Sequence, residues 1–124
     1  MRLTSYNNAT VVVEDQSKAR LLIDPWVVAD LYSSTWSPSI KATHTDILDI
    51  TGSTNVFISH LHADHWDVET ISLLPRSTHF FIPDFSFNDR VIKNKLLTLG
   101  FTEFTFIQLD ELIQINNCIE ISII

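Results

Sequence analysis

The ten residues from Ile58 to Asp67 constrain the fold of this chain more than any other stretch. They read Ile-Ser-His-Leu-His-Ala-Asp-His-Trp-Asp and contain three of the chain's five histidines. Imidazole nitrogen and carboxylate oxygen are ligands that zinc and its first-row neighbours accept. Packing alone gives no reason to gather so many imidazoles, so we prefer a metal site to a polar turn with incidental histidines.

The spacing within this stretch suggests two metal positions. His60 and His62 are two residues apart, so on extended backbone their side chains point the same way and could share one metal. Asp64 and His65 follow where the chain turns, and could face a second metal a few ångströms away. The apolar run Asn55–Ile58 before the stretch predicts a strand, and a helical pattern follows it, so the order is strand, ligand loop, helix.

Strands and helices alternate along the rest of the chain, which favours a layered α/β fold. The two opening strands are nearly continuous in apolar residues, as a sheet covered on both faces requires. A polar turn at 15–18 is expected to join them into a hairpin. The expected strands are Tyr6–Glu14, Leu21–Ile23, Asn55–Ile58, Thr78–Ile82, Glu103–Leu109 and Cys118–Ile124. The expected helices are a turn at Ile47–Ile50, a segment from Asp67 to Pro75, and Asn88–Leu99 capped by Gly100.

Three residues outside the loop carry chemistry but fit ordinary structural roles. Cys118 is the sole cysteine, so no internal disulfide forms, and we expect it to be a small buried residue of the last strand. His44 lies in a polar stretch that predicts a surface loop. His79 begins a predicted strand, where a neutral histidine is more common than a metal ligand.

Composition limits the classes of protein to consider. A length of 124 residues predicts one domain, residues 1–124, large enough to bury a core. A net charge of −7 and a pI near 4.9 argue against nucleic acid as a partner. No apolar stretch has the length of a leader or a membrane span. The single cysteine agrees with a reducing cytoplasm, which is the location we expect.

The histidine-rich loop resembles the signature of the metallo-β-lactamase superfamily. Three neighbouring segments, Leu21–Trp26, Phe57–Ser59 and Glu69–Leu74, are most similar to one branch of it. That branch holds the L-ascorbate-6-phosphate lactonase type of enzyme and the hydrolase-like domain of CMP-N-acetylneuraminate monooxygenase. The resemblance implies an αββα sandwich of which this chain matches the N-terminal half. It also implies one or two bound ions, with zinc expected and manganese or iron as alternatives.

The same resemblance assigns roles to five residues. It implies that His60 and His62 hold the first metal and that Asp64 and His65 hold the second. Asp64 would also orient the attacking hydroxide and take part in proton transfer. Asp24 would lie beneath the metal loop and steady it, with an ordinary strand-ending turn as the alternative. The implied activity is hydrolysis of a small-molecule ester, lactone or phosphorylated sugar-like substrate by a metal-bound hydroxide.

The same sequence features also fit other functions. The chain could be a non-catalytic fragment or interaction module, or a domain that serves an oxygenase related to CMP-N-acetylneuraminate monooxygenase. A nuclease is disfavoured by the acidic charge balance. The family's further ligands, two histidines and a bridging aspartate, are not found after the loop. We therefore expect that the chain is incomplete, or that a second chain or a homo-oligomer completes it.

Overall fold

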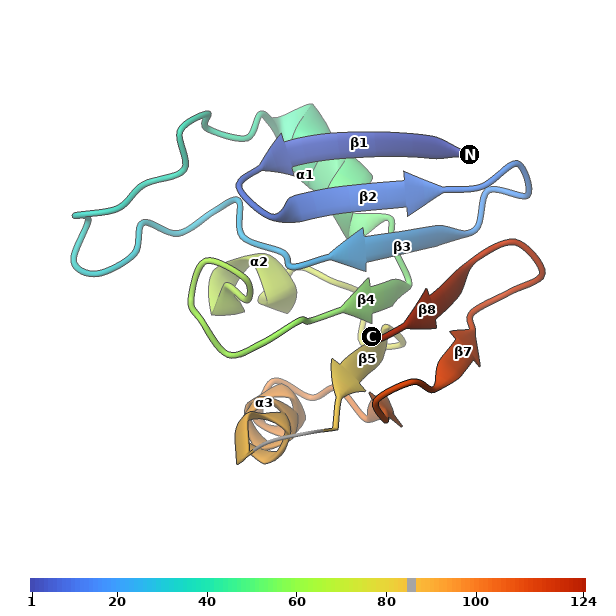
Figure 1. The fold of residues 1–124 in the computed structure, drawn as a ribbon. Helices are drawn as coiled ribbons and strands as arrows, with labels where there is room; N and C mark the ends of the chain where they lie inside the picture. Colours follow the sequence, from blue (N-terminus) through green and yellow to red (C-terminus); the bar gives the residue numbers. More distant parts are fainter. Residues whose placement is uncertain (85–86) are drawn as a thin grey trace.

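A six-stranded mixed sheet forms the centre of the protein in a computed structural model that describes residues 1–84 and 87–124 (Figure 1). Its strands are β1 (Arg2–Asn7), β2 (Thr10–Glu14), β3 (Arg20–Ile23), β4 (Asn55–Phe57), β5 (His79–Pro83) and β6 (Glu103–Ile107). The helices are α1 (His44–Thr51), α2 (Val68–Ser72) and α3 (Phe87–Thr98). A separate two-stranded sheet consists of β7 (Leu112–Gln114) and β8 (Glu120–Ser122).

The strands of the large sheet lie in the order in which they occur along the chain. Strands β1, β2 and β3 pair antiparallel, whereas β3, β4, β5 and β6 pair parallel. Each parallel pair is joined through one helix, α1, α2 or α3 in turn. The alternation of strands and helices predicted this arrangement, and the α/β fold is confirmed.

Local sequence signals explain where the helices begin and end. Thr43 caps α1: its hydroxyl accepts from the Asp46 amide at 3.2 Å, and the Asp46 carboxylate accepts from the Thr43 amide at 2.7 Å. Asp67 caps α2 by accepting from the amides of the first turn. After α3, Gly100 adopts φ +88°, a left-handed conformation that favours glycine. No helix in residues 1–84 and 87–124 combines the length and apolar character needed to cross a membrane.

The larger hydrophobic core lies between the sheet and the helices. The rings of Phe80 and Phe101 meet edge to face with centroids 5.0 Å apart, and both residues are fully buried. Such contacts dominate the stability of a small domain, because buried apolar area is the main favourable term in folding. Further fully buried members of this core are Leu22, Ile50, Val56, Ile58, Ile71 and Ile92.

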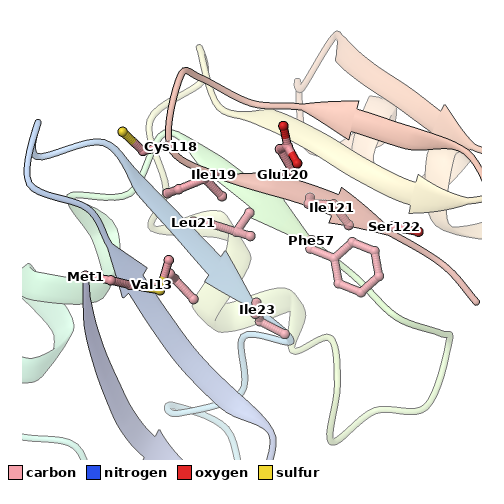
Figure 2. A pocket seen from close by; sticks show the side chains of 10 residues that line it. All are labelled: Met1, Val13, Leu21, Ile23, Phe57, Cys118, Ile119, Glu120, Ile121 and Ser122. Carbon is pink, nitrogen blue, oxygen red and sulfur yellow. The ribbon is translucent and has the colours of Figure 1, made fainter.

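A second, smaller core lies on the opposite face of the sheet, where the β7–β8 hairpin packs (Figure 1). The protein therefore has three layers: helices, the large sheet, and the hairpin. An open groove of about 330 Å³ runs between the hairpin and the sheet (Figure 2). Its apolar lining includes Val13, Leu21, Ile23 and Phe57 from the sheet and Ile119 and Ile121 from the hairpin. The opening strands were expected to be covered on both faces, and this holds for β3, where Leu22 belongs to the larger core and Leu21 to the smaller one.

Three details of the expected element pattern were wrong. The strand expected at Tyr6–Glu14 is a hairpin, because Asn8 adopts φ +41° and turns the chain between β1 and β2. The strand expected at Cys118–Ile124 is the shorter β8, and its partner β7 was not predicted. Cys118 is exposed and not buried, because it lies in the bend between these two strands, where its amide donates to the Asn116 side chain.

Candidate metal centre

The residues predicted to bind metal lie at the carboxyl edge of the parallel strands. Strands β3 and β4 pair with Ile23 opposite Phe57, so the residues that follow each strand emerge side by side. The amide of Asp24 donates to the carbonyl oxygen of Phe57 at 3.0 Å and continues this pairing. Residues 24 and 59 are therefore brought together although 35 positions separate them. In open α/β sheets this edge is the usual place for a ligand site.

The three imidazoles of the loop form one cluster. The ring centroid of His60 lies 4.5 Å from that of His62 and 4.1 Å from that of His65. A turn closes the loop, because the amide of His65 donates to the carbonyl oxygen of His62 at 3.0 Å. The ring of His60 thus contacts both of the others, and the structure brings together all three histidines that the sequence singled out.

Asp24 lies beneath this cluster and is 4% exposed. Its Oδ1 accepts from the Ser59 amide at 2.7 Å, and its Oδ2 accepts from the Ser59 hydroxyl at 2.7 Å. The same Oδ2 lies 2.9 Å from Nδ1 of His65. Of the two roles considered for Asp24, these contacts favour support of the loop over an ordinary turn.

The backbone of Asp24 differs from the extended conformation that a following Pro25 usually imposes, because its φ is +45°. Aspartate tolerates this left-handed region better than most residues. The conformation is held from both sides: the carbonyl oxygen of Asp24 accepts from the Thr10 hydroxyl at 2.8 Å, while its carboxylate is held by Ser59.

Asp64 and His65 face each other in the way a shared metal would require. Oδ2 of Asp64 lies 3.4 Å from Nε2 of His65. Two donors at about 2.1 Å from one tetrahedral zinc are separated by about 3.4 Å. The distance therefore suits a common ion, and it also suits a direct ion pair when His65 is protonated.

The residues fit a metal in their chemistry and in their proximity, but as an incomplete set. Within residues 1–84 and 87–124, no three His, Cys, Asp or Glu side chains are already arranged to hold an ion. The loop instead offers donors in adjacent pairs, namely His60 with His62 and Asp64 with His65. The assignment of these four residues to metal, and the division into two sites, stays a prediction.

The surroundings of His60 favour its neutral form. Burial is the main cause that lowers the pKa of His60 below 6.5, and the neighbouring His65 and His62 lower it further. The carboxylates of Asp24 and Asp64 oppose this effect. Only the neutral imidazole can bind a metal, so the low pKa suits the predicted role.

Thr10 of β2, Thr70 of α2 and the α2 cap Asp67 hold the loop at 25–29 in place. The Thr10 hydroxyl accepts from the amide of Trp26 at 2.9 Å, and the Thr70 hydroxyl accepts from the amide of Val27 at 3.1 Å. The carboxylate of Asp67 accepts from the amide of residue 29 at 3.2 Å while it caps α2. Asp67 was expected to begin this helix, but its contact with the loop was not predicted, and Thr10 offered no sequence signal.

The two remaining histidines do not join the cluster. His44 is exposed at the first position of α1 and not in a loop, because the Thr43 cap starts the helix there. His79 begins β5 as expected, where its Nε2 lies 2.7 Å from the Thr105 hydroxyl and its ring stacks on Phe81.

Comparison with known proteins gives sequence relatives that are much longer than this chain. No protein-family model matches it. A Mycobacterium tuberculosis protein named "Putative Rieske 2Fe-2S iron-sulfur protein" is 30% identical over 105 residues, which cover 84% of this chain and 20% of that protein. A protein of the same name from Mycolicibacterium smegmatis is 30% identical over 106 residues, again 84% of this chain and 20% of the relative.

Solved structures establish the fold. A "possible metal-dependent hydrolase" from Veillonella parvula superposes with a TM-score of 0.64 at 22% identity, over 89% of this chain and 42% of that one. An isothiocyanate hydrolase from Delia radicum gut bacteria gives 0.59 at 22% identity, over 85% and 41%. The diiron β-hydroxylase CmlA from Streptomyces venezuelae gives 0.62 at 23% identity, over 90% and 21%. The chain therefore has the α/β fold of the metallo-β-lactamase-like proteins.

Proposed function

We propose that this chain carries part of the active site of a metal-dependent hydrolase of the metallo-β-lactamase fold. The observation that carries the proposal is the cluster of three imidazoles and Asp64 at the carboxyl edge of β3 and β4, with buried Asp24 beneath it. The substrate class is a small-molecule ester, lactone or phosphorylated sugar-like compound. This class follows from the sequence resemblance, and a net charge of −7 argues against nucleic acid as the substrate.

Each residue of the cluster has a role in this proposal. His60 and His62 would hold one ion, and Asp64 and His65 a second, with zinc expected and manganese or iron as alternatives. A bound ion of this kind lowers the pKa of its water to about 7 and polarises a substrate oxygen. Asp64 would accept a hydrogen bond from the attacking water at its carboxylate and orient it. Asp24 would hold His65 and the loop in place.

The proposal places the missing metal ligands in other protein segments. Two donors per ion are fewer than the three protein ligands typical of catalytic zinc. The solved structures with this fold are longer, and this chain spans 42% of the one from Veillonella parvula. We expect further polypeptide or a second copy of the chain to supply the remaining donors. Native mass spectrometry with added zinc tests this, since a stable monomer that holds two zinc ions would contradict it.

Replacement of single histidines tests the site itself. We expect His62→Ala to weaken zinc binding at least about tenfold, because it removes one donor from the cluster. His44→Ala is the matched control, since His44 is exposed on α1 outside the cluster. Isothermal titration of zinc into both variants measures the effect. Equal zinc affinity of the wild type and His62→Ala would refute the assignment.

A panel of substrates tests the reaction. With zinc and any completing partner present, we expect hydrolysis of a sugar lactone, its phosphorylated form or an aryl ester, and none of single-stranded DNA. Turnover should disappear in Asp64→Asn, because the amide cannot accept a proton from the attacking water. Unchanged turnover in that variant would remove Asp64 from the mechanism.

A cytoplasmic location belongs to the same proposal and is supported by the use of a single cysteine.

A second candidate is a metal-binding domain within an iron–sulfur oxidoreductase, and the names of the mycobacterial relatives favour it. A Rieske cluster requires two cysteines and two histidines, and this chain has one cysteine, Cys118. The cluster would therefore belong to another part of a larger protein. Metal analysis of protein purified without added metal separates the candidates. Bound zinc, manganese or iron with hydrolysis of the panel favours the hydrolase, bound metal without hydrolysis favours the oxidoreductase, and no stoichiometric metal indicates a non-catalytic module.

A further inference from the structure

Ser59 lies where the buried carboxylate and the imidazole cluster meet. Its hydroxyl oxygen lies 2.7 Å from Oδ2 of Asp24, 2.9 Å from Nδ1 of His60 and 3.5 Å from Nδ1 of His65. Its amide donates to Oδ1 of Asp24 at 2.7 Å. We propose that Ser59 is a positioning residue that fixes the tautomer of His60, so that the Nε2 atom of this ring is the one free to bind metal. The value of this tautomer to the protein rests on the function proposed above.

Counting hydrogens gives the direction of each bond. An ionised carboxylate can only accept, so the single hydroxyl hydrogen of Ser59 goes to Oδ2 of Asp24. The hydroxyl oxygen then has lone pairs to offer His60 and no second hydrogen. Nδ1 of His60 must therefore carry the proton and donate it to Ser59 across 2.9 Å. In a neutral ring this leaves the lone pair on Nε2.

The carboxylate of Asp24 also fixes the tautomer of His65, and it does so by a direct hydrogen bond. Nδ1 of His65 lies 2.9 Å from Oδ2 of Asp24, so it donates its proton directly. The lone pair of His65 is then on Nε2, the atom that faces the carboxylate of Asp64 at 3.4 Å. Asp24 thus sets two tautomers, one directly and one through Ser59. Orientation of metal-binding imidazoles by a carboxylate is a general device, and here a hydroxyl extends its reach to a second ring.

His62 offers an internal control. In the described part of the chain no hydrogen bond holds the ring of His62, which contacts the cluster edge-on to His60. Loss of the Ser59 hydroxyl should therefore change the tautomer of His60 and leave that of His62 as it was. A hydroxyl that served only to satisfy the buried Asp24 would leave all three rings unchanged.

The test is a long-range proton–nitrogen NMR correlation on the metal-free protein labelled with ¹⁵N-histidine. The spectrum is recorded at about pH 8, above the usual imidazole pKa of about 6.5, and it shows which ring nitrogen carries the proton. In the wild type we expect His60 and His65 to be protonated at Nδ1. In Ser59→Ala we expect His60 to shift toward Nε2 protonation while His65 is unchanged, and Ser59→Thr should restore the wild-type spectrum.

Either of two results would overturn the proposal: Nδ1 of His60 unprotonated in the wild type, or a tautomer of His60 that is the same in wild type and Ser59→Ala. If the alanine variant fails to fold, the wild-type spectrum still tests the proposal, because an unprotonated Nδ1 of His60 would overturn it. Titration of zinc alone then separates this inference from the proposed function. We expect about tenfold weaker zinc binding in Ser59→Ala. If the tautomers change as expected but neither the wild type nor the variants bind zinc, the proposed function fails and the inference about Ser59 stands.

Discussion

Replacement of Asp24 tests how much of the site's geometry depends on one carboxylate. The side chain is 4% exposed and accepts hydrogen bonds from the amide and hydroxyl of Ser59 and from His65. Alanine at this position removes all three hydrogen bonds and leaves their donors in a partly buried loop without partners. It also keeps a left-handed backbone, φ +45°, without the polar side chain that makes this conformation tolerable.

The expected loss of stability can be built from these terms. A hydrogen bond to a charged group contributes about 1.5–3 kcal/mol, and the left-handed conformation costs an ordinary residue about 1–2 kcal/mol. The three bonds share Ser59 and His65 as neighbours, so they are not additive. We therefore expect Asp24→Ala to lower the free energy of unfolding by about 3–6 kcal/mol. This is a large part of the roughly 5–15 kcal/mol available to a domain of this kind. Asp24→Asn should lose only about 1–3 kcal/mol, because the amide still accepts from Ser59 and tolerates positive φ.

Urea unfolding followed by circular dichroism measures both variants. Asp30→Ala is the matched control, because Asp30 is an exposed carboxylate of the same loop, and its loss should change stability by less than about 0.5 kcal/mol. The reasoning would be refuted if Asp24→Ala were as stable as Asp30→Ala, or if Asp24→Asn were the less stable of the two Asp24 variants. Asp24→Gly separates the cost of the left-handed backbone from the cost of the lost hydrogen bonds. It should be more stable than Asp24→Ala, because glycine adopts positive φ without strain.

Two further predictions concern the scaffold. Phe80→Ala should lower the free energy of unfolding by about 3–5 kcal/mol, because Phe80 is fully buried against Phe101. Urea unfolding measures this loss, and a value below about 1 kcal/mol would contradict the observed packing. The Lys18 hydrogen bond to Glu14, helped by Arg2 and Arg20 and opposed by partial burial, lowers the pKa of Glu14 below 4.5. Its stabilisation is therefore complete above pH about 4.5 and is lost as the pH falls through the lower folded pKa. Between pH 7 and pH 3 the melting temperature of Glu14→Gln should fall less steeply than that of the wild type. Parallel curves for the two proteins would show that ionised Glu14 does not contribute to stability.

The sequence predicted the elements where a local signal was strong. The apolar run at Asn55–Ile58 became β4, and the stripe at Asn88–Leu99 became α3, closed by Gly100 as expected. Prediction failed where a turn lacked its usual residues. The turn between β1 and β2 uses Asn8 and an alanine in place of Asn-Gly or Asp-Gly, so the hairpin read as one strand.

The histidine cluster was predictable because its members are close in sequence, whereas their support was not. Asp24 accepts from Ser59 across 35 positions and lies against His65 across 41. Thr10 holds the loop after Asp24 from a third strand. Such partners are set by the register of β3 on β4, and no local pattern encodes that register. Only the resemblance to known proteins indicated a role for Asp24, and it gave none for Thr10 or Ser59.

The placement of Asp24 also explains why the site lies at this edge of the sheet. Asp24 accepts from the Ser59 amide because it follows β3, which pairs parallel with β4 and places Ile23 opposite Phe57. Strands β1 and β2 pair antiparallel, and from the start of β2 Thr10 donates to the carbonyl oxygen of Asp24. The change from antiparallel to parallel pairing at β3 is therefore what lets one buried acid reach two rings of a loop 35 to 41 residues away. A shift of β3 by one residue would turn the carboxylate to the other face of the sheet and leave the imidazoles without support.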